Sequence, residues 1–183
     1  MRVILVRHGN AGRKDQWRRA DRLRPLSERG ARQAEMLKEV VIGLKPTRII
    51  SSPYVRCVQT VAPTAKETGL KVGRSAALVP TTPLKALRLV RKLSTPKSKS
   101  GTVICTHGEV LGAILSDISK SDGVKLGRRP PGAKGSIWVL DFRRGKLVAA
   151  EYISPTSMTS TPQRSATSSI EAKKTQSRSS DPR

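Results

Sequence analysis

Residues 1–10 read MRVILVRHGN, and the segment LVRHG at positions 5–9 ends an apolar run abruptly. A strand that reaches the protein surface and turns there gives this pattern. A catalytic histidine at the carboxyl end of a strand, beside an arginine that binds an anion, gives it too. In both interpretations residues 2–6 form a short buried strand, and the remaining sequence has to decide between them.

Helices and strands are predicted to alternate after this segment. Apolar residues at helical spacing predict helices over residues 27–43, 54–68, 83–93 and 109–118, the first with Ser27 as its N-cap. Short apolar runs predict strands over 47–50 and 102–105, and residues 136–142 and 146–153 predict a hairpin at the carboxyl end. This alternation favours an α/β fold with a mostly parallel sheet.

Both histidines of the chain follow a predicted strand and precede a glycine. His8-Gly9 follows the first strand and His107-Gly108 follows the third, while the second strand leads into Arg56 in the first turn of a helix. Ligands of parallel sheets bind outside the carboxyl ends of the strands. Two such coincidences, with arginines at two strand ends, favour a catalytic site over a structural role for a single histidine.

Phosphoryl transfer needs this set of side chains. A phosphoryl group in flight spreads negative charge over its oxygens, and fixed cations around it stabilise the transition state. Arginine suits the task because its planar fork is always charged and binds phosphate through two hydrogen bonds. A histidine beside arginines has a lowered pKa, since a second positive charge is disfavoured, and it stays neutral and nucleophilic near pH 7.

Three motifs resemble the histidine phosphatase superfamily, which includes the phosphoglycerate mutases. They are RHG at 7–9, SSPYVRCVQT at 51–60 and THGEV at 106–110. The segment RPLSERGARQAE at 24–35 resembles the SixA-type phosphohistidine phosphatase branch. The resemblance covers residues 1–154 and implies a three-layer α/β sandwich, in which helices cover both faces of the sheet.

Two longer segments resemble the phosphatase-like carboxyl-terminal domain of bacterial two-domain Nudix hydrolases. These are WRRADRLRPLSERGARQAE at 17–35 and KGSIWVLDFRRGKLVAAEYISP at 134–155. The chain contains no Nudix box, so the resemblance concerns the phosphatase-like part alone. It makes a separate Nudix hydrolase a candidate partner.

The superfamily resemblance implies a role for each matching residue. His8 would attack phosphorus and become a transient phosphohistidine, and Arg7, Arg56 and His107 would complete the pocket around the phosphoryl group. Water would then release phosphate, and no metal or other cofactor would be required. The predicted substrate-binding residues are Gly9, Asn10, Lys14, Arg24 and Gly108.

A general acid is missing where many members of the superfamily carry one. Residues 73–83, GRSAALVPTTP, contain no carboxylate, and the candidates elsewhere are Asp21 and Glu109. A leaving group of low pKa needs little protonation, whereas an alkoxide does. The sequence therefore favours a phosphohistidine protein or a nucleotide phosphate as substrate, and argues against sugar phosphate esters.

The chain is strongly basic, with a net charge of +23. Residues 1–154 hold 31 basic and 11 acidic residues, so +20 belongs to the predicted phosphatase domain. This charge predicts weak polyanion binding, although no nucleic-acid-binding motif accompanies it. Residues 155–183 form a Ser/Thr-rich basic segment that cannot bury enough apolar surface to fold, and we expect a disordered tail.

We expect a cytoplasmic protein. Two cysteines without a CxxC motif predict reduced thiols, and no apolar run has the roughly 18 residues of a membrane helix. Three functions remain open at this stage. They are a phosphatase acting on a phosphorylated small molecule or phosphoprotein, a non-catalytic phosphate- or nucleotide-binding regulatory module, and a basic nucleic-acid-binding protein on the same fold.

Overall fold

The computed structural model describes residues 1–95, 101–126 and 132–157 of the chain. Its strands are β1 (Arg2–Arg7), β2 (Arg48–Ser51), β3 (Val72–Arg74), β4 (Thr102–Thr106), β5 (Ile137–Arg143) and β6 (Lys146–Ile153). These strands form one sheet in the order β3-β2-β4-β1-β5-β6. The first four strands in this order are parallel to one another. Strand β5 runs antiparallel to β1, and β6 runs antiparallel to β5. The prediction of a mostly parallel sheet with a carboxyl-terminal hairpin is confirmed.

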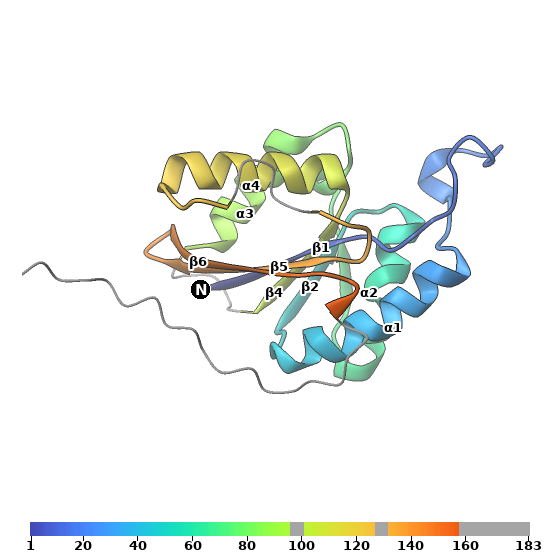
Figure 1. Ribbon diagram of the computed structural model, residues 1–183, viewed down its shortest axis with the longest axis horizontal. Helices are drawn as coiled ribbons and strands as arrows, with labels where there is room; N and C mark the ends of the chain where they lie inside the picture. The colour runs from blue at the N-terminus through green and yellow to red at the C-terminus, as the bar shows by residue number, and fades with distance from the viewer. Residues whose placement is uncertain (96–100, 127–131, 158–183) are drawn as a thin grey trace, which may run out of the picture.

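Helices cover both faces of the sheet, as the three-layer architecture requires. They are α1 (Glu28–Gly43), α2 (Val55–Thr68), α3 (Pro83–Leu93) and α4 (Gly108–Asp122). Two short 3₁₀ turns, η1 (Asp21–Leu23) and η2 (Ala76–Leu78), precede α1 and α3. Figure 1 shows α3 and α4 on one side of the sheet and α1 and α2 on the other.

Strand β1 lies inside the sheet and is buried on both faces. Val3 and Leu5 belong to the apolar core beneath α3 and α4. Ile4 and Val6 belong to the core beneath α1 and α2. This double burial explains why β1 is a continuous apolar run rather than an alternating one.

The chain leaves the adjacent strands β1 and β4 in opposite directions. After β1 it continues to α1 on one face, and after β4 it continues to α4 on the other (Figure 1). Such a switch between neighbouring parallel strands opens a crevice at their carboxyl ends. His8 follows β1 and His107 follows β4, so the topology places both histidines at this crevice.

Several local predictions hold in the structure. The bounds of α3 and β6 agree with the predicted helix and strand. Ser27 caps α1, because its Oγ accepts a hydrogen bond from the Gly30 amide at 3.2 Å. Cys57 and Cys105 are both buried and free.

No helix in the described ranges is long and apolar enough to cross a membrane.

Other predictions differ from the structure or lie beyond it. Strand β3 was not predicted, because its three residues include one apolar side chain and sit at the sheet edge. Helix α4 extends four residues past its predicted end, through the polar turn that finishes at Asp122. The predicted tail falls almost wholly outside the described residues, and the domain boundary at 154 stays a prediction.

Candidate active site

His8 presents one ring nitrogen to the crevice in a defined tautomer. Its Nδ1 lies 2.8 Å from the Gly9 carbonyl oxygen, which can only accept, so Nδ1 carries the proton and donates it. The Nε2 atom therefore holds a lone pair, and it accepts a hydrogen bond from Arg56 Nε at 3.2 Å. The backbone is fixed as well, because the His8 amide donates to the Thr106 carbonyl of β4 at 3.0 Å.

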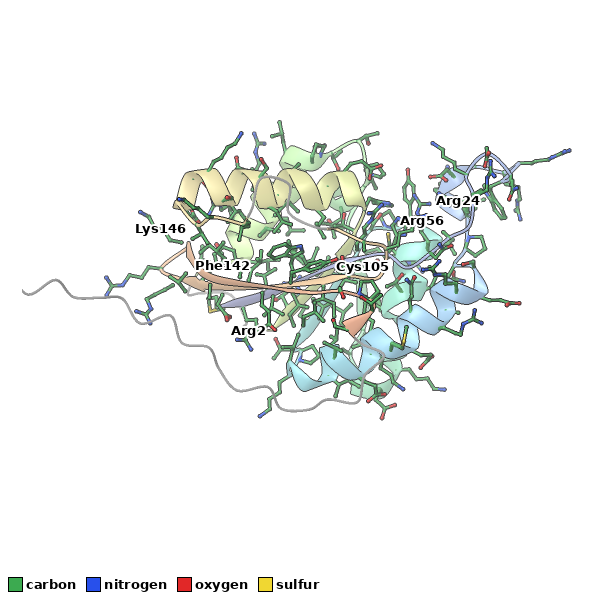
Figure 2. The ribbon with its side chains drawn as sticks, in the orientation of Figure 1. Arg2, Arg24, Arg56, Cys105, Phe142 and Lys146 are labelled. Atoms are coloured by element: carbon green, nitrogen blue, oxygen red, sulfur yellow. The ribbon has the colours of Figure 1, made fainter. Side chains whose placement is uncertain are left out.

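Arg56 connects the two histidines from the first turn of α2. Its Nη2 donates to His107 Nδ1 at 3.3 Å, while its Nε reaches His8. Arg56 is 3 % exposed, and its guanidinium carbon lies 4.7 Å from the centre of the Tyr54 ring. Figure 2 shows Arg56 at the same end of the molecule as Arg24, in the loop before α1.

His107 is the N-cap residue of α4, and its ring lies 5.3 Å from that of His8 in a T-shaped arrangement. Because its Nδ1 accepts from Arg56, its Nε2 carries the proton and donates to Ser52 Oγ at 2.9 Å. The Tyr54 ring packs edge-on against it at 4.7 Å. Residues from β1, β2, α2 and α4 thus enclose one site.

Both imidazoles are neutral near pH 7. Burial lowers the pKa of His8 to about 4, and the charges of Arg56 and Arg7 contribute to the shift. Burial likewise lowers the pKa of His107 to about 3, with repulsion from His8 and Arg56 as further causes. A neutral imidazole with an unprotonated ring nitrogen can act as a nucleophile.

Arg7 lies against the start of α4. A Cβ atom on Gly108 would stand 2.7 Å from Arg7 Cζ, so only glycine allows this approach. Nη1 of Arg7 donates to the Gly132 carbonyl, whereas Nε is buried without a hydrogen-bond partner among the described residues. A buried donor of this kind, beside the uncapped amino end of a helix, suits an anion.

Asp21 is the member of the site whose position the sequence did not reveal. Its Oδ2 pairs with Arg56 Nη2 at 3.0 Å, and its Oδ1 pairs with Arg24 Nε at 2.8 Å. Partial burial opposes ionisation, but these arginines outweigh it and lower the pKa of Asp21. The carboxylate is thus ionised, and it orients Arg56 rather than storing a proton. The second candidate acid, Glu109, is exposed in the first turn of α4.

The predicted substrate-binding residues have two kinds of surroundings. Gly9 and Asn10 make structural contacts: the Gly9 amide donates to Thr60 Oγ1, and Asn10 Oδ1 accepts from the Gly12 amide. Lys14 and Arg24 line a groove beside the site. Their roles toward a substrate stay predictions, as do those of the residues around His8.

Across residues 1–95, 101–126 and 132–157, no group of three or more His, Cys, Asp or Glu side chains is arranged to hold a metal ion.

Comparison with known proteins finds similarity to histidine phosphatases. The family model described as histidine phosphatase superfamily (branch 1) matches residues 3–79. An 8-oxo-(d)GTP phosphatase from Mycolicibacterium smegmatis is 34% identical over 158 residues, which are 84% of this chain and 48% of that protein. Residues 3–79 are thus similar to the histidine phosphatase superfamily, and the chain spans about half the length of this curated relative.

Solved structures confirm the fold. The protein histidine phosphatase SixA, solved with tungstate, superposes with a TM-score of 0.72 at 20% identity, over 87% of this chain and all of that one. A SixA-type protein from Agrobacterium tumefaciens gives a TM-score of 0.68 at 22% identity, covering 84% and 97% of the two chains. The likeness to two-domain Nudix hydrolases is not shown by these comparisons.

Proposed function

We propose that this phosphatase hydrolyses a phosphoryl group through a covalent phosphohistidine on His8, without a metal ion. The observation that carries the proposal is the lone pair of His8 Nε2. The Gly9 carbonyl holds the proton on the opposite nitrogen, and the Arg56 cation lies 3.2 Å from Nε2. The nucleophile, His8, and a cation suited to bind phosphoryl oxygens, Arg56, are therefore in direct contact.

The reaction takes two displacements. In the first, the His8 Nε2 lone pair releases its hydrogen bond from Arg56 Nε and bonds to phosphorus. The bond from phosphorus to the leaving atom breaks with its electron pair on that atom. The Nδ1 proton stays on the ring, where the Gly9 carbonyl stabilises the new positive charge. In the second, a water oxygen bonds to phosphorus, the P–N electron pair returns to Nε2, and the water proton leaves with phosphate and solvent.

The cations have separate roles in this scheme. Arg7 and Arg56 bind the equatorial oxygens of the phosphoryl group, and the unpaired Arg7 Nε is a donor ready for one of them. His107 is neutral and accepts from Arg56, so it positions that guanidinium toward the phosphoryl group. Asp21 holds the opposite side of the same guanidinium.

The leaving group is inferred from the missing acid. The Asp21 carboxylate is ionised by its arginines, and no other carboxylate of the described residues contacts His8 or Arg56. A leaving group that needs no proton is then favoured, such as a nucleotide phosphate or an imidazole. The relative named 8-oxo-(d)GTP phosphatase supports the nucleotide choice, and the SixA fold is compatible with a phosphohistidine protein.

Turnover of p-nitrophenyl phosphate in the presence of EDTA tests the proposal. We expect activity in the wild type, and a fall to the background rate in His8→Ala with an unchanged melting temperature. The phosphoenzyme trapped from the wild type should be acid-labile and base-stable. Phosphate binding without turnover would instead identify a regulatory module. A panel of nucleoside phosphates and phosphohistidine proteins, assayed for phosphate release, then identifies the substrate class.

A further inference from the structure

A groove of about 670 Å³ lies beside the active site and is strongly cationic. Its lining residues are Gly12, Arg13, Lys14, Asp15, Arg24 and Lys134. The single carboxylate, Asp15, is already paired with Arg13 at 2.5 Å. The ammonium groups of Lys14 and Lys134 have no hydrogen bond or ion pair with another described residue, so the groove carries positive charge without an anion to balance it.

Lys134 is held at the end of β1 by its neighbours in the chain. The Gly135 amide donates to the carbonyl oxygens of Arg7 and His8, each at 3.1 Å. Gln33 Nε2 donates to the Lys134 carbonyl at 3.0 Å. Gly135 adopts a φ of +81°, a conformation that other residues rarely take. This anchoring fixes the Lys134 backbone beside the nucleophile before any ligand binds.

The groove and the phosphoryl pocket share one electrostatic field. Burial lowers the pKa of Lys134, and repulsion from Arg7, Arg24 and Arg56 lowers it further. The charge of Lys134 in turn helps to keep His8 neutral. A partly desolvated cation among other cations is stabilised when an anion binds beside it.

Arg24 joins the two regions structurally. It is 8% exposed, and its Nη1 donates to the Ala11 carbonyl at 2.8 Å, which fixes the loop that forms the groove wall. Its Nε binds Asp21, the carboxylate that orients Arg56. The shape of the groove and the orientation of the Arg56 guanidinium therefore depend on the same segment, residues 11–24.

We infer that this groove is a second anion subsite, which binds the phosphate adjacent to the one transferred to His8. The inference rests on the proposed function and names its substrate class: phosphoanhydrides such as nucleoside diphosphates. His8 Nε2 bonds to the terminal phosphorus, the bridging P–O bond breaks, and the bridging oxygen keeps the electron pair. The departing phosphate monoester is then an anion beside Lys134, so the step needs no general acid.

The test compares Lys134→Met with Lys146→Met, an exposed lysine at the start of β6. Lys146 lies at the opposite end of the molecule from Arg56 (Figure 2). kcat/KM is measured for ADP and for p-nitrophenyl phosphate. We expect kcat/KM for ADP, divided by kcat/KM for p-nitrophenyl phosphate, to fall ~10-fold or more in Lys134→Met. The reason is that a charged hydrogen bond to the second phosphate is lost. Lys146→Met should keep the wild-type ratio within about twofold, since no phosphate contact is removed there.

Two results would overturn the inference: an unchanged ratio in Lys134→Met, or a wild-type enzyme that hydrolyses phosphohistidine peptides well but not ADP. If the wild type hydrolyses neither of the small substrates nor phosphohistidine peptides, the proposed function has failed instead. Calorimetric binding of inorganic pyrophosphate and orthophosphate then tests the subsite alone. Tighter binding of pyrophosphate that is lost in Lys134→Met supports the subsite, and equal binding of both ions rejects it.

Discussion

Neutral histidines make the active site sensitive to acid. His8 and His107 have an ordinary pKa near 6.5 in the unfolded chain but about 4 and about 3 in the folded protein. Below pH 6.5 the unfolded chain therefore binds more protons than the folded one, so the free energy of unfolding decreases as the pH is lowered. The same burial keeps His8 nucleophilic at neutral pH, so reactivity and acid sensitivity have one cause.

This difference predicts the pH dependence of folding. As the pH falls from about 6.5 toward 4, the free energy of unfolding should decrease in the wild type. His107→Gln removes one of these protons, so its slope between pH 6 and 4.5 should be shallower by up to about 1.4 kcal/mol per pH unit. Urea denaturation at several pH values measures both slopes. Equal slopes would mean that His107 protonates in the folded protein near its ordinary pKa.

The pairing of Asp21 with Arg56 could not be predicted from the sequence. The motifs around His8, Arg56 and His107 are local, because each directly follows a strand. Asp21 begins the short 3₁₀ turn η1 in a segment without periodicity, 35 residues before the arginine that it binds. Nothing in the loop sequence indicates this pairing, and only the tertiary fold brings the two side chains together.

At the scale of elements, strand ends explain most of what could be predicted. Buried runs followed by a histidine and a glycine mark β1 and β4, and amphipathic spacing marks α1 to α3. The edge strand β3 was beyond prediction, since its pairing with β2 rather than its side chains defines it. Lys14 and Arg24 are predicted from the sequence as substrate-binding residues, but Lys134 is not, because it joins the groove from a segment 120 residues after Lys14.

The start of α4 gives a prediction at this scale. Gly108→Ala places a methyl group 2.7 Å from Arg7 Cζ and 2.9 Å from Arg7 Nε, so the guanidinium must move. The far end of an arginine shifts at small cost, so the melting temperature should change little. Turnover of p-nitrophenyl phosphate should fall ~10-fold or more, as a lost charged hydrogen bond implies.

Gly112→Ala is the matched control in the same helix. A Cβ at Gly112 meets no atom within 4 Å. Activity should stay at the wild-type level, and stability should rise by about 0.5–1 kcal/mol because alanine favours the helix. If Gly108→Ala also keeps full activity, Arg7 does not bind the phosphoryl group.

At the scale of the whole molecule, most of the positive charge lies outside the active site. The net charge of +23 includes many exposed cations, among them Lys66, Lys71, Arg88 and Arg143. These exposed groups form a diffuse positive field that attracts polyanions without selecting among them. The field can raise the encounter rate with an anionic substrate, but it supplies no direct readout of bases.

Duplex DNA binding distinguishes this interpretation from a dedicated nucleic-acid-binding protein. Affinity that comes from phosphate contacts alone falls by ~10³-fold or more between 50 and 200 mM salt when several phosphates are neutralised. We expect this steep loss for a short random duplex, measured by fluorescence anisotropy. His8→Ala should bind equally well, because the buried His8 ring does not contribute to the surface field. Tight binding that persists at 200 mM salt and depends on base sequence would make nucleic acid the physiological ligand. Under the proposed function, the same DNA should inhibit phosphatase activity only at low salt, because it competes for the surface field and not for the His8 pocket.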